Sequence, residues 1–342
     1  MSCYHPLLAI DLGPKMEKDH WRGFNGVDGK HRTKTRFVFI ENTEENRKLP
    51  NTVEIPCGKC IGCSLDYARK WANRCMAEAK YHDQNFFLTL TYRDECLPIG
   101  LKGNPTLDPD SISKFMKKLR KRFGDGIKFF SCGEYGGQTF RPHYHMILFG
   151  LNLQDCSEFF PCVVDGKEIL IKKKGKTGQS LLYSQALQEC WDNKGEIQIG
   201  DVSWDSCCYV ARYMMKKQAD SEEVYRLLGV EKPFVRMSRR PGIGYQFYQD
   251  HKDIIGLTDE IYLPGKDGAI RSGMSGYFKK LQTKDFDDNG ELDYHFKTME
   301  NFRSSKVKND SMVAFSGLGS IEEIRKNQFR TRIFCFDSCT SS

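Results

Sequence analysis

The stretch RPHYHMILFG at 141–150 contains two histidines, His143 and His145, separated by a single residue. Side chains alternate along a β-strand, so both imidazoles would point the same way, about 7 Å apart along the backbone. Such a pair can hold one divalent ion and leave positions open for phosphate oxygens and water. Glu134 is the expected third ligand, because a hairpin would return it towards the pair. Taken alone, the pair also fits two imidazoles that only form hydrogen bonds on a sheet surface.

A second candidate group lies downstream, where Tyr209, Tyr213 and Lys216 share one face of a predicted helix. A separate apolar stripe would anchor that helix and consists of Cys207, Val210, Ala211 and Met214. A phenol is a weak nucleophile near neutral pH, because its pKa is about 10. A metal-bound phosphate and a nearby lysine would offset this by stabilising the phenolate and the developing charge. The alternative is two ordinary tyrosines on a surface helix.

Together the two groups predict a metal-dependent endonuclease that cuts one strand of DNA. One tyrosine would attack the phosphate, leaving a protein-linked 5′ end and a free 3′ hydroxyl. The phosphotyrosine bond keeps the energy of the phosphodiester, so the strand can later be rejoined. Two tyrosines would let one hold the old end while the other cuts again. We expect Tyr213, which lies beside Lys216 and Lys217, to make the first cut.

The motif CGKCIGC supplies three thiols at two-residue gaps, from Cys57, Cys60 and Cys63. A tetrahedral zinc site needs a fourth ligand. Cys3 is the first choice, with His5 or Cys75 behind it, and the site would pin the N-terminal segment. A ferredoxin-like motif would have its fourth cysteine at position 67, which is Tyr67, so an iron–sulfur cluster is disfavoured. Reduced thiols without metal remain the alternative.

Hydrophobic patterns predict the elements that carry these residues. We expect helices at 64–81, 110–123 and 207–217, and strands at 86–92, 127–135, 143–150 and 196–203. The helix at 110–123, with its N-cap at Asp110 or Ser111, buries one apolar stripe. Its other face, turned to water or DNA, carries Lys117, Lys118, Arg120 and Lys121. The segment 151–195 is expected to leave the core. This order indicates an α+β domain with a mainly antiparallel sheet.

Composition sets further bounds. The chain has 342 residues, 39% of them hydrophobic, and a net charge of +7. Basic clusters at 117–122 and 172–174 can contact phosphates, although solvated helix faces explain them equally well. No apolar run is long enough to cross a membrane, and no secretion signal is evident at the N-terminus. The 14 cysteines are therefore expected to be reduced thiols in a cytoplasm, some of them binding metal.

Six stretches resemble the HUH endonucleases, and within them the replication initiators of microviruses, above all those of the gokushovirus type. They are PCGKCIGC at 56–63, FFLTLTY at 86–92, CGEYG at 132–136, RPHYHMILFG at 141–150, YVARYMMKK at 209–217 and SRRPGIG at 238–244. The resemblance implies an HUH-endonuclease-like domain with a central, mainly antiparallel sheet flanked by helices. It also implies rolling-circle replication, nicking of the replicative form, and Mg²⁺ or Mn²⁺ as cofactor. Its paired metal ligands, nucleophiles and accompanying lysines match His143 and His145, Tyr209 and Tyr213, and Lys216 or Lys217.

The expected organisation is an N-terminal segment at 1–56, a nicking domain at 57–245 and a C-terminal extension at 246–342 to which no role is assigned. The expected partner is single- and double-stranded DNA at a replication origin, with host helicase and polymerase as further candidates, in the cytoplasm of a bacterial host. Two alternatives stay open. One is a zinc-containing DNA-binding protein without catalysis. The other is a single-strand transposase of the same superfamily, which would normally be shorter and needs only one tyrosine.

Overall fold

The computed structural model describes residues 3–14, 35–164, 167–175, 178–219, 222–258, 260–265 and 268–286, together with residues 300, 303, 304, 307 and 311. The chain divides into two compact units, Met1–Asp66 with Gly276–Ser342 and Tyr67–Ser275. Helix α2 (Ile61–Ala79) begins in the first unit and continues into the second. Among the described residues, no helix is both long and apolar enough to cross a membrane.

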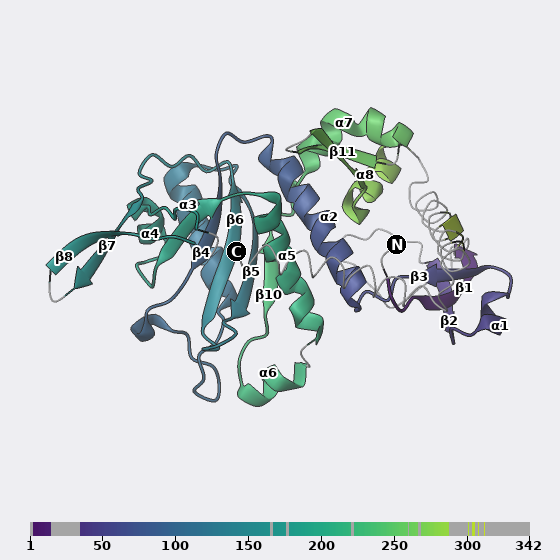
Figure 1. The fold of residues 1–342 in the computed structure, drawn as a ribbon, viewed down its shortest axis with the longest axis horizontal. Helices are drawn as coiled ribbons and strands as arrows, with labels where there is room; N and C mark the ends of the chain where they lie inside the picture. Colours follow the sequence, from purple (N-terminus) through teal and green to yellow (C-terminus); the bar gives the residue numbers. More distant parts are fainter. Residues whose placement is uncertain are drawn as a thin grey trace, which may run out of the picture. The chain divides into compact units, whose positions relative to one another are not determined.

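A five-stranded antiparallel sheet forms the centre of the second unit (Figure 1). Its order is β10 (Phe234–Met237), β5 (Lys128–Tyr135), β6 (Pro142–Phe149), β4 (Asn85–Leu90) and β9 (Ile197–Asp201). The sequence predicted four of these strands to within two residues at most ends, and the α+β class with a mainly antiparallel sheet is confirmed. Only the edge strand β10 was not predicted, because four residues give too short a pattern.

Alternation along the central strand β6 separates the two faces of this sheet. Tyr144, Met146 and Leu148 point to one face, where they pack with α3 (Pro109–Phe123) and α4 (Gln185–Cys190). Ile147 and Phe149 point to the other, where they pack with α2 and α5 (Trp204–Ala219). We call these the α3 face and the α5 face. The two helical layers explain why β6 is hydrophobic at nearly every position.

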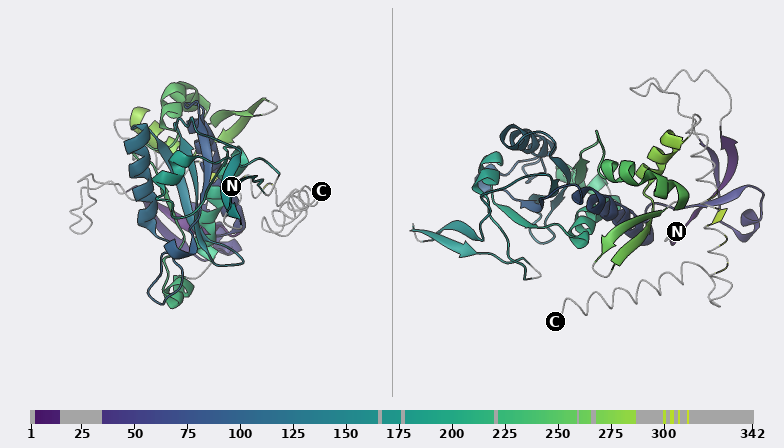
Figure 2. Two further views of the ribbon diagram at one scale, coloured as in Figure 1. Left: turned by 90° about the vertical axis from the view of Figure 1, so that its left-hand side faces the viewer. Right: turned by 90° about the horizontal axis from the view of Figure 1, so that it is seen from above.

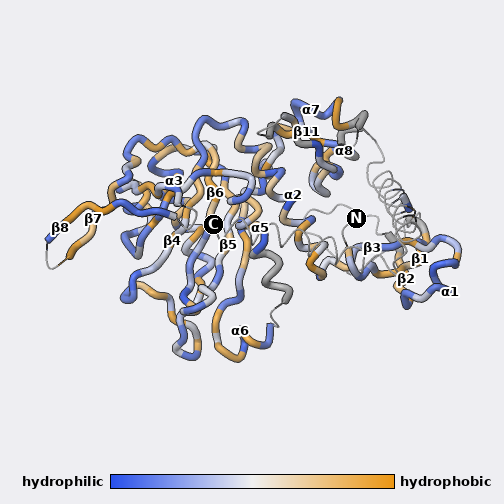
Figure 3. Tube along the Cα trace, in the orientation of Figure 1, coloured by the Kyte–Doolittle hydropathy of each residue, from blue (hydrophilic) through white to orange (hydrophobic). Residues whose placement is uncertain are grey.

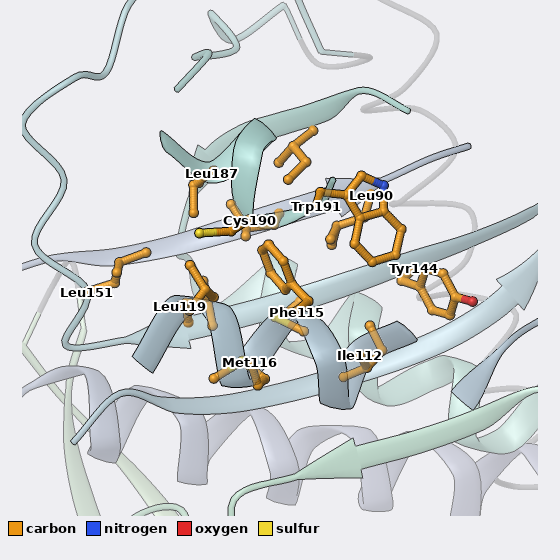
Figure 4. Close-up of a cluster of buried hydrophobic side chains, with 14 of the residues drawn as sticks. Leu90, Ile112, Phe115, Met116, Leu119, Tyr144, Leu151, Leu187, Cys190 and Trp191 are labelled. Atoms are coloured by element: carbon orange, nitrogen blue, oxygen red, sulfur yellow. The ribbon is translucent and has the colours of Figure 1, made fainter. Parts of the chain in front are cut away.

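Helix α3 covers its face with the predicted apolar stripe, in which Ile112, Phe115, Met116 and Leu119 are buried (Figure 4). Its N-cap is Asp108, whose side chain accepts a hydrogen bond from the Asp110 backbone N–H. The predicted N-cap at Asp110 or Ser111 was therefore two to three residues late. Pro109 explains the difference, because proline is favoured at the first helical position, where its missing N–H costs nothing.

The expectation that residues 151–195 leave the core is only partly correct. The hairpin of β7 (Phe159–Val164) and β8 (Lys167–Lys172) does extend away from its unit (Figures 1 and 2). It exposes hydrophobic side chains such as Val163 and Leu170 (Figure 3). At the two ends of the segment, however, Leu151 and Trp191 are buried in the core of the α3 face. The Lys- and Gly-rich middle obscured these two anchoring ends.

The remaining elements were not predicted. The first unit contains a three-stranded antiparallel sheet with β1 (Leu7–Pro14) between β2 (Thr35–Ile40) and β3 (Thr52–Ile55). It also contains α1 (Glu44–Arg47) and α8 (Gly276–Phe286). The second unit adds α6 (Glu222–Leu228), α7 (Tyr245–Thr258) and the hairpin of β11 (Glu260–Gly265) and β12 (Gly268–Gly273). Short strands and polar helices leave weak periodicity in a sequence, which explains why they were missed.

Candidate metal and tyrosine site

The β5–β6 hairpin brings Glu134 directly opposite His143, and Cys132 opposite His145. The side chains of Glu134, His143 and His145 therefore share the α5 face. Their potential ligand atoms all lie within 4.8 Å of one another. Oε1 of Glu134 lies 2.8 Å from Nε2 of His143 and 3.0 Å from Nε2 of His145. Adjacent ligands of an octahedral ion with bonds of about 2.1 Å lie about 3 Å apart, so these separations suit Mg²⁺ or Mn²⁺.

The hydrogen-bonding of His143 tests whether a cation fits. Its Nδ1 lies 3.1 Å from the backbone oxygen of Arg141, and its Nε2 faces the Glu134 carboxylate. A neutral imidazole has one N–H donor, so it can satisfy only one of these two acceptors. The arrangement needs either a second proton on the ring or a cation between Nε2 and the carboxylate. A metal ligand whose other ring nitrogen donates to a backbone carbonyl has this second pattern.

The second histidine is held by two residues of the neighbouring strand β4 that sequence reasoning missed. Nδ1 of His145 lies 3.1 Å from the Thr89 hydroxyl, and the Phe87 ring stacks on the imidazole with centroids 5.6 Å apart. Thr89 is paired directly with His145 in the β4–β6 register. The signal was present in FFLTLTY, because alternate positions of a strand next to the histidine strand must share a face with the histidines.

Burial and charge act in opposite directions on Glu134. Its side chain is only 6% exposed, and burial by itself would raise the pKa of the carboxyl. Hydrogen bonds from His143 and His145, together with their positive charge, outweigh burial and leave the pKa of Glu134 below its ordinary value. The group is therefore a carboxylate at neutral pH, which is the form that binds a divalent ion.

Helix α5 brings a tyrosine to this group. Cys207, Val210 and Ala211 are buried against the sheet, as the predicted apolar stripe requires. Tyr209 therefore points away from that contact and is 38% exposed. Its ring nevertheless packs edge-on against the His145 ring, with centroids 5.0 Å apart. One side of the phenol is thus in contact with a candidate metal ligand while another remains open to solvent.

Other candidate residues are not brought to the site. Tyr213, Lys216 and Lys217 continue helix α5, but their side chains lie outside the described residues. The basic residues of α3 belong to the layer on the opposite face of the sheet. The group comprises Lys117, Lys118, Arg120 and Lys121. Within it, Lys118 forms an ion pair with Asp192, and Arg120 donates to the backbone oxygen of Ile127. A DNA strand bound at the histidines would not reach this helix directly.

A separate cluster lies in the first unit, where the structure brings together Cys3, Cys57, Cys60 and Cys63. Cys3 is thus the fourth cysteine of this group, as the sequence suggested. Cys75 is instead fully buried in the core of the α5 face, and His5 is exposed and outside the cluster. Cys207 and Cys208 are buried apolar packing residues, as predicted.

The fold and the site define an α+β protein with a Glu-His-His group on a central antiparallel sheet and a tyrosine helix beside it. The family model for the ORF2 type of replication-associated protein matches residues 85–218, which contain the Glu-His-His group and the whole of α5 up to Gln218. No solved structure matches the chain.

Curated relatives extend this similarity over most of the chain. Replication-associated protein ORF2 of Spiroplasma virus 4 is 31% identical over 299 residues, covering 86% of this chain and 84% of that protein. Replication-associated protein VP4 of Bdellovibrio phage phiMH2K is 29% identical, covering 66% and 67% respectively. Replication-associated protein ORF4 of Chlamydia phage 1 is 29% identical, covering 76% and 61%. The chain belongs to the family of microvirus replication-associated proteins, which confirms the resemblance to that family.

Proposed function

We propose that the protein initiates rolling-circle replication by nicking one strand of phage replicative-form DNA at the origin. The observation that carries the proposal is the contact of Tyr209 with His145, with ring centroids 5.0 Å apart. It supports a nucleophile beside a group able to hold a metal ion. Membership of a family of phage replication-associated proteins supports DNA as the substrate.

In the proposed reaction a tyrosine oxygen attacks a phosphorus atom of the DNA backbone. The bond from phosphorus to the 3′ oxygen breaks, and that oxygen takes up a proton to become a free 3′ hydroxyl primer. The phenol loses its proton, and the 5′ phosphate remains linked to tyrosine. In the reverse step a 3′ hydroxyl attacks the phosphotyrosine, which rejoins a strand without an external energy source. Lys216 and Lys217 are proposed to stabilise the phenolate.

Glu134, His143 and His145 are proposed to hold Mg²⁺ or Mn²⁺, which when bound would polarise the scissile phosphate. The mixed nitrogen and oxygen donors suit such an ion, as do their separations. Thr89 and the Arg141 carbonyl would keep both rings oriented with Nε2 towards the ion. Phe87 would fix the plane of the His145 ring by stacking.

We assign the reaction to the unit of residues 67–275, which overlaps most of the range 57–245 expected from the sequence. The order of the sheet, with the histidines on its central strand, supports an HUH-type nicking domain. Single- and double-stranded origin DNA would be the partner, in the cytoplasm of the bacterial host. Host helicase and polymerase are proposed to act on the primer that the nick creates.

The experiment uses labelled single-stranded oligonucleotides that tile the cognate genome, incubated with the full chain and Mn²⁺ and resolved on a denaturing gel. We expect a covalent protein–DNA band that locates the origin. It should disappear with a chelator, with His143→Ala, and with Tyr209→Phe and Tyr213→Phe combined. Tyr262→Phe is the matched control, because Tyr262 is 44% exposed, close to the 38% of Tyr209, and lies outside the site.

Two results would contradict the proposal. An adduct that persists in the double tyrosine variant would place the covalent link on another residue. Tight binding without any adduct, with Mg²⁺ or Mn²⁺ and on supercoiled as well as single-stranded DNA, would favour a DNA-binding protein without catalysis.

A further inference from the structure

The four cysteines of the first unit have the spacing of ligands around a single metal ion. Sγ of Cys60 lies 3.8 Å from Sγ of Cys3, and all four sulfur atoms lie within 4.8 Å of one another. A tetrahedron with metal–sulfur bonds of about 2.3 Å has its sulfur atoms about 3.8 Å apart. A four-iron cluster would hold its thiolates farther apart, because iron and sulfide ions lie between them. We propose that these cysteines bind one zinc ion.

The backbone around the cluster supports thiolate ligands. Amide N–H groups of Tyr4 and Cys57 donate to Sγ of Cys60 and Cys3, respectively, with N–S distances of 3.2 Å. Cys60 N–H donates in the same way to Cys57, at 3.3 Å. Such donors stabilise the negative charge that four thiolates bring to one ion. Gly58 has φ +73°, a left-handed conformation that glycine allows at little cost and that turns the chain back between two ligands.

The chemistry of the donors selects the metal. Four thiolates favour zinc over Mg²⁺ or Mn²⁺, which prefer oxygen ligands. The Glu-His-His group has the opposite preference, because one of its three donors is a carboxylate. The chain would therefore carry two different ions, a tightly held zinc among sulfurs and an exchangeable ion at the histidines. All four sulfur positions belong to protein ligands, so the zinc is structural rather than catalytic.

The position of the cluster shows what the zinc would stabilise. Cys3 precedes β1, Cys57 follows β3, and Cys63 lies in the first turn of α2. One ion would thus join the central strand and an edge strand of the three-stranded sheet to the start of a helix. The sheet has a small apolar cluster, in which Ala9 and Val53 are buried. A core of this size contributes little stability, and small folds commonly depend on a metal to compensate.

The test measures metal directly on the full chain and does not depend on nicking. We expect one zinc per chain by mass spectrometry of the metal content, retained after dialysis against EDTA that removes Mn²⁺. Cys60→Ser should lose it, whereas Cys156→Ser should retain it, because Cys156 is an exposed cysteine outside the cluster. His143→Ala should also retain it. A DNA-nicking failure would therefore leave this proposal intact, and a lack of zinc would leave the proposed nicking intact.

Wild-type protein provides a second readout in case Cys60→Ser does not fold. Titration with a mercurial thiol reagent should release one zinc as four thiols react, and Co²⁺ exchanged for zinc should give the absorption of a tetrahedral thiolate site. On zinc removal, amide exchange should rise in β1 and β3 and stay unchanged in β5 and β6. Wild-type protein that contains no zinc would overturn the proposal. So would iron in its place, or disulfides among these four cysteines.

Discussion

The rings of Tyr209 and His145 pack edge to face, with 5.0 Å between centroids and 82° between planes. His145 lies on the central strand of the sheet and Tyr209 on helix α5, 64 positions later. Their contact depends on the burial of Cys207, Val210 and Ala211 beneath the helix. The relationship between the candidate metal ligand and the candidate nucleophile is therefore set by core packing, and it can be tested at each of its supports.

The order in which the two tyrosines act gives the first prediction. Tyr213→Phe should lower adduct formation on an origin oligonucleotide by at least about 10³-fold, because it removes the nucleophile of the first cut. Tyr209→Phe should still form the adduct but fail to transfer the bound strand to a second origin. Denaturing gels that follow both steps make the comparison. Normal nicking by Tyr213→Phe together with an inactive Tyr209→Phe would reverse the order.

Thr89 is predicted to position His145. Thr89→Val keeps the shape of the side chain but removes the hydroxyl 3.1 Å from Nδ1. Loss of such a partner should lower metal affinity about 10- to 100-fold, while Thr89→Ser should restore it. The measurement is the Mn²⁺ concentration that gives half-maximal adduct. Thr91→Val is the control, because the Thr91 hydroxyl donates to the backbone oxygen of Glu196 and does not contact a histidine. Equal metal dependence of the two valine variants would refute the positioning role.

Gly133 is predicted to be required for packing next to Glu134. A Cβ at this position would lie 3.0 Å from a ring carbon of Phe234 and 3.1 Å from a methyl carbon of Leu107. Gly133→Ala should therefore destabilise the protein by about 1–3 kcal/mol, because an overpacked core must shift. Urea unfolding checks this. Gly137→Ala, in the same motif but with no atom within 4 Å of the added carbon, should be neutral. Equal effects of the two substitutions would contradict the explanation.

Glu78 links three segments of the second unit. Its carboxylate accepts hydrogen bonds from Lys128 at 2.8 Å and from the Gly244 N–H at 2.7 Å, and it also bonds His82. Burial would raise the pKa of Glu78, but these partners outweigh it and lower that pKa. The folded protein therefore gains stability from the ionised form above the unfolded-state pKa, and loses it as pH falls through the folded-state pKa.

Glu78→Gln should thus cost about 3 kcal/mol near pH 7, as expected for breaking a buried ion pair, and progressively less in acid. Urea unfolding of both proteins across a pH series measures the difference. Glu189→Gln is the control and should change stability little, because Glu189 and its partner Arg122 are both nearly half exposed. A stability difference that stays constant down to acidic pH would show that ionisation of Glu78 does not contribute.

Local patterns were sufficient for the strongest elements and for the identity of the candidate ligands. The spacing of His143 and His145 required a strand for both to face one way, and the structure has that strand. The apolar stripe of α3 predicted the residues it buries. Both predictions succeed because side-chain direction within one element follows from its backbone period alone.

Tertiary structure decided what lies across from what. The register of β4 against β6 pairs Thr89 with His145, and the sheet separates the lysines of α3 from the histidines although both precede residue 150. The fold also brings Cys3 to Cys57, 54 positions away. The sequence by itself determined the chemical groups and the faces on which each element carries them. Their assembly depended on long-range packing and strand register, which no local period contains.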